Sequence, residues 1–134
     1  MATEKGTVKK TKLSAYSRPI KSGIKAIKLK DKDRVVNVEI TDGQKEIMLF
    51  ANSGKSIRFH EKDARPMGRV SQGVKGMRLD KNQKLISLIV LDEGNILTAT
   101  ENGFGKQTKV DEFSNQRRGV KASSPYRLLN EMVM

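Results

Sequence analysis

The feature that most constrains the fold is an internal repeat with a period of about fifty residues. A turn-forming glycine recurs 48 and then 49 residues apart, in the phrases "ATEKGTVKKT", "FANSGKSIRF" and "ATENGFGKQT", at Gly6, Gly54 and Gly103. A second phrase, glycine followed by an apolar residue and lysine, begins at Gly23, Gly73 and Gly119. Such a period predicts a row of similar units, each contacting its neighbours, rather than one irregular core.

Within each repeat the apolar pattern is that of β-strands. In "KSIRF" the side chains of Ile57 and Phe59 alternate with polar ones, which is typical of a half-buried strand. The runs 34–40 and 84–90 are rich in β-branched residues and predict more fully buried strands. Turns are expected at "TDGQ", "NSGK", "DEGN" and "ENGFG". About four strands per fifty residues favour an all-β, propeller-like array of antiparallel blades.

The repeat also predicts an organisation along the chain. Residues 1–29 are expected to form a partial blade, 30–79 a blade, and 80–122 a blade whose last strand is incomplete. In this register Gly119 is equivalent to Gly73. The phrase breaks after residue 122, so 123–134 is interpreted as a divergent tail that could form a short helix or be disordered. The chain then holds roughly two and a half repeats of a larger array.

Charge is the second constraint, because 27 Lys and Arg residues face 15 Asp and Glu residues, for a net charge of +12. This excess predicts a polyanionic partner, first nucleic acid and second an anionic membrane surface. Many of the cations recur in register: Lys25, Lys75 and Lys121 in the repeated phrase, Lys28 and Arg78 after it, and Arg18, Lys21, Arg65, Arg69, Arg117 and Arg118 before it. With Arg58 they predict a basic stripe along one rim; the alternative is that they only maintain solubility.

Other sites receive little support. The sequence "GKS" at 54–56 resembles the end of a phosphate-binding loop, but Leu49 stands where that loop needs glycine and a strand follows. Asp31 and Asp33 fit a solvated turn better than a metal site, and His60 is the only histidine. No catalytic set, bound metal or cofactor is therefore expected in this chain. Aromatic residues are few, which favours duplex DNA over a single strand that stacks on rings.

The ends and composition add weak expectations about location. Cysteine is absent, which fits a reducing compartment. The first ten residues contain no apolar segment typical of a secretory signal. The longest apolar run, 85–91, is too short to span a bilayer. No membrane partner is expected.

Three phrases carry a resemblance to a known family. "MATEKGTVKKT" (1–11), "RPMGRVSQGVKGMRL" (65–79) and "ILTATENGFGKQTKVDEF" (96–113) closely resemble the C-terminal domain of the DNA gyrase A subunit. The resemblance extends from residue 1 to about 122. It implies a β-pinwheel, a propeller variant of about six blades that exchange strands and wrap duplex DNA around a basic outer rim.

The resemblance also implies the setting of the chain. Wrapping by that family supports negative supercoiling by an ATP-hydrolysing holoenzyme, so the implied partners are double-stranded DNA, the remainder of the gyrase A subunit and the gyrase B subunit. ATP and Mg²⁺ would bind to other parts, and this chain would be noncatalytic. The implied location is the cytoplasm, in association with the nucleoid.

The family carries a box, Q-R-R-G-G-K-G, that is important for wrapping. Residues 116–122, "QRRGVKA", match it at five of seven positions, namely Gln116, Arg117, Arg118, Gly119 and Lys121. Val120 and Ala122 depart from it. Because "GVKA" also reads as the third copy of the repeated phrase, residues 119–122 fit either description. The resemblance predicts DNA contact by Arg117, Arg118 and Lys121.

Two alternatives remain open from the sequence. The related C-terminal domain of the topoisomerase IV A-type subunit has similar blades with more degenerate rim sequences, and the long phrase around Gly103 favours gyrase over it. A propeller-like adaptor that binds a protein partner is the alternative from a different functional class.

Overall fold

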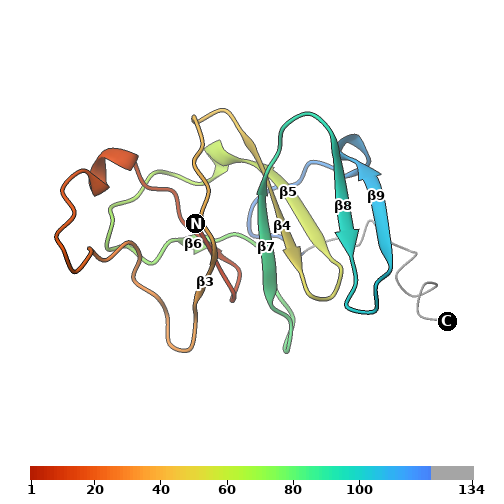
Figure 1. Ribbon diagram of the computed structural model, residues 1–134, viewed down its shortest axis with the longest axis horizontal. Helices are drawn as coiled ribbons and strands as arrows, with labels where there is room; N and C mark the ends of the chain where they lie inside the picture. The colour runs from red at the N-terminus through yellow and green to blue at the C-terminus, as the bar shows by residue number, and fades with distance from the viewer. Residues whose placement is uncertain (122–134) are drawn as a thin grey trace.

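The fold is seen in a computed structural model that describes residues 1–121 (Figure 1). The helix or disorder predicted for 123–134 lies outside these residues. The strands are β1 (Ala2–Thr3), β2 (Thr7–Val8), β3 (Val35–Asn37), β4 (Glu46–Ala51), β5 (Ser56–His60), β6 (Val74–Lys75), β7 (Leu85–Val90), β8 (Asn95–Ala99) and β9 (Gly105–Lys109). Short 3₁₀ helices are η1 (Leu13–Tyr16), η2 (Glu61–Asp63) and η3 (Val110–Glu112). The predicted all-β class is confirmed.

The first two blades are each built from a hairpin and from one or two strands that belong to the following repeat. The hairpins are β1–β2, β4–β5 and β8–β9, and every pairing between the named strands is antiparallel. In the first sheet the order is β3-β1-β2-β6, so both flanking strands come from the second repeat. In the second sheet, β7 from the third repeat pairs with β4. Neighbouring repeats are therefore joined by strand exchange.

The core lies in the gaps between blades, and β4 contributes to both gaps. Ile47 and Leu49 belong to a cluster shared with the first blade, while Met48 and Phe50 belong to a cluster shared with the third. The ring of Phe50 packs edge-on against Phe113, with centroids 6.2 Å apart. Because alternate side chains of a strand point to opposite faces, burial on both faces requires the continuous apolar run of β4.

The repeated turn glycines have the same backbone conformation. Gly6, Gly54 and Gly103 have φ of 85°, 77° and 86°, a region that favours glycine. The predicted turns are therefore confirmed at these three hairpins. The predicted alternation of β5 is also confirmed, because Ile57 and Phe59 are buried.

The repeat register predicted after the third hairpin is wrong. Residues 115–120 occupy the same backbone positions as residues 66–71. At the start of each loop, the amide of Met67 donates to the carbonyl of Lys10, and the amide of Gln116 donates to the carbonyl of Arg58. At the end, the carbonyl of Ser71 accepts from the amide of Lys28, and the carbonyl of Val120 accepts from the amide of Arg78. Gly119 is thus equivalent to Val70, not to Gly73. Lys121 is likewise not equivalent to Lys25 and Lys75. The spacing stays at 49 residues, and the counterpart of β6 falls beyond the described residues.

The run 34–40 forms a shorter strand than predicted, and its side chains are more exposed. Only Val35–Asn37 forms β3, and Val38 and Ile40 are 54% and 75% exposed. β3 pairs with β1 and contacts β7. The residues that follow it, 38–43, line an open cavity of about 480 Å³ that Leu13 and Tyr16 also border. The second half of the apolar run is therefore neither a strand nor buried within residues 1–121. In β7, similarly, Ile86 is 57% exposed while Leu85 and Leu88 are buried.

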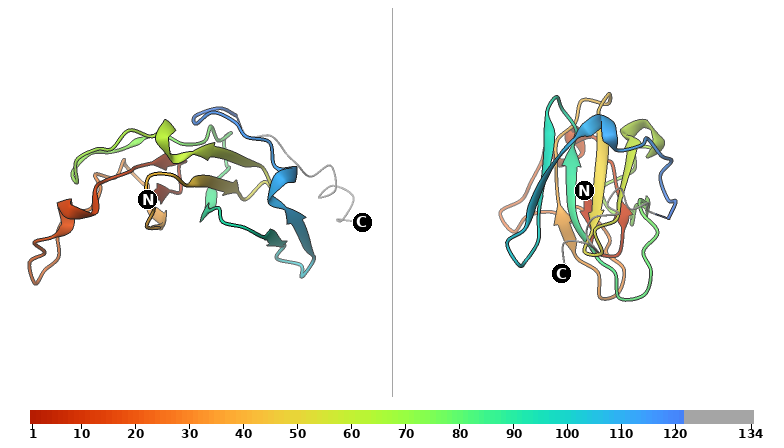
Figure 2. Two further views of the ribbon diagram at one scale, coloured as in Figure 1. Left: turned by 90° about the horizontal axis from the view of Figure 1, so that it is seen from above. Right: turned by 90° about the vertical axis from the view of Figure 1, so that its right-hand side faces the viewer.

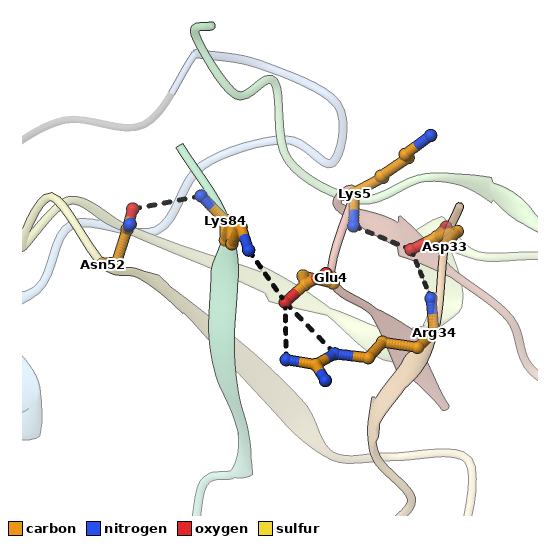
Figure 3. A network of polar contacts seen from close by, with 6 residues as sticks. All are labelled: Glu4, Lys5, Asp33, Arg34, Asn52 and Lys84. Atoms are coloured by element: carbon orange, nitrogen blue, oxygen red, sulfur yellow. Dashed lines mark hydrogen bonds and ion pairs between the residues drawn. The ribbon is translucent and has the colours of Figure 1, made fainter. Parts of the chain in front are cut away.

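A polar network joins the first two blades at the ends of their strands (Figure 3). The carboxylate of Glu4, in the β1–β2 turn, accepts hydrogen bonds from the guanidinium of Arg34 and lies 3.6 Å from the ammonium of Lys84. The amide of Lys84 donates to the side-chain oxygen of Asn52. Because both cations are largely exposed, these ion pairs contribute little free energy, and the network aligns strand ends that packing holds together.

Strand exchange makes a sharp prediction at Gly73. Its φ is +95°, and a Cβ there would lie 2.5 Å from the carbonyl oxygen of Val8 in β2. We expect Gly73→Ala to lower the free energy of unfolding by about 2–4 kcal/mol, measured by urea denaturation. Gly68→Ala is the control, because a Cβ at Gly68 meets nothing within 4 Å, and its effect should stay within about 0.5 kcal/mol. Equal stability of the two variants would contradict the observed packing of β6 on β2.

Candidate nucleic-acid interface

Two of the three basic segments lie along one side of a curved array. Figure 2 shows the described chain as an arch in its left view, with the segments that follow η2 and η3 running along the convex side. These segments contain the loops and strand starts in which the sequence places most of the recurring cations. A partner that follows the convex side would pass successive repeats in order.

Eight of the predicted contact residues are exposed, and their side chains make no hydrogen bond or ion pair within residues 1–121. They are Arg18, Lys21, Lys25, Lys28, Arg65, Lys75, Arg78 and Arg117. This group, called here the free rim cations, contains members from all three repeats. Their charges are available to a partner without breaking an internal contact.

Lys121 is exposed but is paired with an acidic group. Its ammonium lies 3.1 Å from a carboxylate oxygen of Asp80, and the ammonium of Lys55 lies 3.6 Å from the other oxygen. A hydrogen bond from Lys121, together with the charges of Lys121 and Lys55, lowers the pKa of Asp80 below its ordinary value. The ionised Asp80 carboxylate reduces the positive charge that these two lysines present to a partner.

Arg58 is committed to contacts within the protein. Its guanidinium forms an ion pair with Glu46 across the β4–β5 ladder and donates to the carbonyls of Val110 and Phe113. The side chain is mostly buried. Sequence reasoning placed Arg58 with the DNA contacts. The observed geometry favours a structural role, in which Arg58 fastens η3 to the second blade.

Arg69 and Arg118 are partly buried and turn toward the backbone of the preceding repeat. Nη1 of Arg69 donates to the carbonyl of Lys25 at 2.9 Å, and Nη1 of Arg118 donates to the carbonyl of Lys75 at 2.7 Å. Gly119, with φ of 80°, brings its amide to 2.7 Å from the carbonyl of Gly76. Gln116 is half-buried beside this loop. The box-like segment is thus a junction between repeats as well as a basic surface.

Lys9 is a buried lysine that sequence reasoning missed. Its ammonium donates to the carbonyl of Ala26 at 2.7 Å and to the carbonyl of Arg69. Burial, and secondarily the charge of Arg69, lowers the pKa of Lys9. The repeat could have revealed this burial. Lys10 and Arg58 are equivalent positions, so Lys9 is equivalent to Ile57, which is buried. The buried ammonium of Lys9 thus links the segment that contains Ala26 to the segment that contains Arg69.

Glu61 anchors the connection between β3 and β4. One carboxylate oxygen accepts from the hydroxyl of Thr41 at 2.6 Å and the other from the amide of Lys45 at 2.8 Å. Burial alone would raise the pKa of Glu61. These hydrogen bonds, the positive charge of Lys10 and a backbone bond from Gly43 outweigh burial and hold the pKa below its ordinary value. Sequence reasoning missed Glu61, since this acid shows no recurrence in the repeat.

The lowered pKa of Glu61 predicts an acid-dependent loss of stability. Because the folded-state pKa lies below the unfolded value of about 4.3, the contribution is fully present above that pH and is lost as the pH falls through the folded-state pKa. We expect Glu61→Gln to lower the free energy of unfolding by about 1–3 kcal/mol at pH 7. The difference from wild type should shrink below about pH 4.3 in urea titrations. A difference that is constant from pH 7 to pH 3 would contradict this assignment.

Comparison with known proteins identifies the family. The family model described as the DNA gyrase C-terminal domain, a β-propeller, matches residues 1–42, 45–92 and 94–130. The chain belongs to the DNA gyrase C-terminal domain family. The three matched segments agree with the three hairpins of the structure, and the β-pinwheel that the resemblance implied is confirmed.

Curated relatives place this domain in a longer protein. The chain is 52% identical over 120 residues to the DNA gyrase A subunit of Pseudomonas aeruginosa, covering 89% of this chain and 13% of that protein. It is 48% identical over 122 residues to the DNA gyrase A subunit of Escherichia coli, covering 90% and 14%. The chain thus spans about one seventh of the length of the relatives it matches, and they support its topoisomerase context.

Two solved structures share the fold. The C-terminal domain of DNA topoisomerase IV superposes with a TM-score of 0.88 at 32% identity, over 92% of this chain and 39% of that one. A DNA gyrase A C-terminal domain gives a TM-score of 0.82 at 26% identity, over 91% and 41%. The backbone therefore does not separate gyrase from topoisomerase IV. The curated gyrase relatives, at about 50% identity, agree with the preference drawn from the phrase around Gly103.

Two further observations bear on the site. No helix among residues 1–121 is long and apolar enough to cross a membrane. In the same part of the chain, no group of three or more His, Cys, Asp or Glu side chains is arranged to hold a metal ion. Asp33 instead accepts hydrogen bonds from the amides of Lys5 and Arg34 in the turn that precedes β3.

Proposed function

We propose that the chain binds the backbone of duplex DNA along the convex side of its blades, as a wrapping segment of a DNA gyrase A subunit. The observation that supports this most directly is the set of free rim cations, which is drawn from all three repeats and engages no group within the described residues. Duplex DNA carries one phosphate charge per about 1.7 Å of axis, so a row of cations at a regular spacing can release several counterions. Phosphate contacts of this kind position DNA without reading its sequence.

The curvature of the array suits a bent duplex. Bending a site of 20–30 base pairs by 40–90° costs on the order of 1–6 kcal/mol, and phosphate contacts made along the bend offset that cost. Blades that are joined by strand exchange keep the cations of successive repeats at fixed spacing. The DNA path is therefore set by the protein, and the proposed contribution to supercoiling is this imposed path.

The remaining parts of the proposal concern the larger assembly. We propose that this region is noncatalytic and binds no cofactor, and that cleavage, ATP and Mg²⁺ chemistry are carried out elsewhere in gyrase. Its partners would be DNA, the remainder of the gyrase A subunit, and the gyrase B subunit, in the bacterial cytoplasm at the nucleoid. Within residues 1–121, no group of three or more His, Cys, Asp or Glu side chains could hold a metal ion.

The salt dependence of binding tests the rim. For binding to duplex DNA, we expect Lys25→Gln and Lys75→Gln each to flatten the slope of log K against log salt by about 0.9, because each removes one phosphate contact. Lys32→Gln, an equal change of charge outside the recurring set, should leave the slope unchanged. Fluorescence anisotropy across a salt series measures all three. A shallow wild-type slope would favour the adaptor alternative, whose apolar interface responds weakly to salt.

Wrapping is tested by linking number. The chain is bound to nicked circular DNA, the nick is ligated, the protein is removed and the topoisomers are separated on a gel. We expect a shift in linking number that grows with protein concentration, because a duplex held on a curved rim is closed with altered writhe. Retardation of the DNA without a shift would support phosphate binding and contradict wrapping by this segment.

A further inference from the structure

The two inter-repeat loops each contain one arginine with the same unusual contact. Nη1 of Arg69 donates to the carbonyl of Lys25, and Nη1 of Arg118 donates to the carbonyl of Lys75. Lys25 and Lys75 are equivalent in the repeat, and so are the two arginines. The same hydrogen bond is therefore formed twice, each time between a loop and the rim segment of the preceding repeat.

Arg118 makes a second contact that extends this junction. Its Nε donates to the carbonyl of Asp63 at 2.9 Å, so one guanidinium joins the end of η2 to β6. Beside it, the amide of Gly119 donates to the carbonyl of Gly76, and the amide of Arg78 donates to the carbonyl of Val120. Arg118 thus lies at one end of a short run of backbone hydrogen bonds between repeats.

We propose that Arg69 and Arg118 are positioning residues that fix the distance between the rim cations of one repeat and those of the next. Each does so by holding the backbone of the lysine that faces the partner. A hydrogen bond from a charged donor to a carbonyl is stronger than one between neutral groups, so this contact resists local opening. The inference deepens the proposed function and rests on it where DNA is concerned.

The neighbouring Arg117 provides a matched comparison. It is exposed and has no internal hydrogen bond or ion pair in the described part of the chain, whereas Arg118 is half-buried and makes two hydrogen bonds. The two residues carry the same charge and are adjacent. The geometry predicts that they separate into different roles, with Arg117 contacting phosphate and Arg118 positioning the blade.

The experiment compares Arg118→Lys with Arg117→Gln in the full chain. Lysine keeps the charge of Arg118 but cannot reproduce a planar donor that reaches two carbonyls. Without DNA, we expect Arg118→Lys to accelerate amide hydrogen exchange at Gly119 and Arg78 at least about tenfold, with global stability retained. Arg117→Gln should leave exchange at both amides unchanged. Arg69→Lys should repeat the first result at Lys28, whose amide donates to the carbonyl of Ser71.

The DNA readouts then distinguish positioning from charge. We expect Arg118→Lys to keep the wild-type salt slope but to give a smaller linking-number shift at equal DNA occupancy. Arg117→Gln should flatten the slope by about 0.9. Wild-type exchange and a wild-type linking shift in Arg118→Lys would overturn the positioning role. If wild-type protein bound no DNA, the proposed function would fail, and the exchange data alone would still decide whether Arg118 holds the junction.

Discussion

Strand exchange between repeats is the constraint on which the rest of the structure depends. A hairpin such as β1–β2 has two residues in each strand and could not persist alone in water. It is completed by β3 and β6, which enter from the next repeat on either side. The apolar clusters, the turn glycines and the polar network around Glu4 all stabilise strands that are paired in this way. Neither of the first two blades is therefore independent of the repeat that follows it.

The fold was largely predictable because repetition multiplies a weak local signal. Alternation at Ile57 and Phe59 indicates one strand, but the recurrence of the same turn at Gly6, Gly54 and Gly103 indicates an array. The predicted burial of residues 34–40 was wrong because an apolar pattern does not record how many neighbours a strand has. The register at Gly119 was wrong because a three-residue phrase was matched by its letters. The hydrogen bonds of the adjoining loop follow a constant spacing of 49 residues instead.

The candidate interface was predictable only as a set of charges. Sequence reasoning can count cations in register, but it cannot tell an arginine that faces solvent from one that faces a carbonyl. Arg117 and Arg118 are adjacent and identical in type, and the structure gives them different surroundings. Lys9 and Glu61 were missed for the opposite reason, because their importance comes from burial and not from recurrence. Among the described residues, the free rim cations are the predicted contact residues that are exposed to solvent and unpaired, as a binding surface requires.

The two buried faces of β4 have a consequence for how such arrays change over generations. Each interface is built from residues of two successive repeats, so a gene that gains or loses a unit must be cut at equivalent points of two repeats. If the inserted or deleted segment is one repeat of 48 or 49 residues, each hairpin still meets flanking strands of the same kind, wherever in the repeat the segment begins. A segment of any other length would leave strands equivalent to β4 with one apolar face exposed to solvent. Selection on packing between neighbours would therefore constrain the length of a blade more tightly than the number of blades.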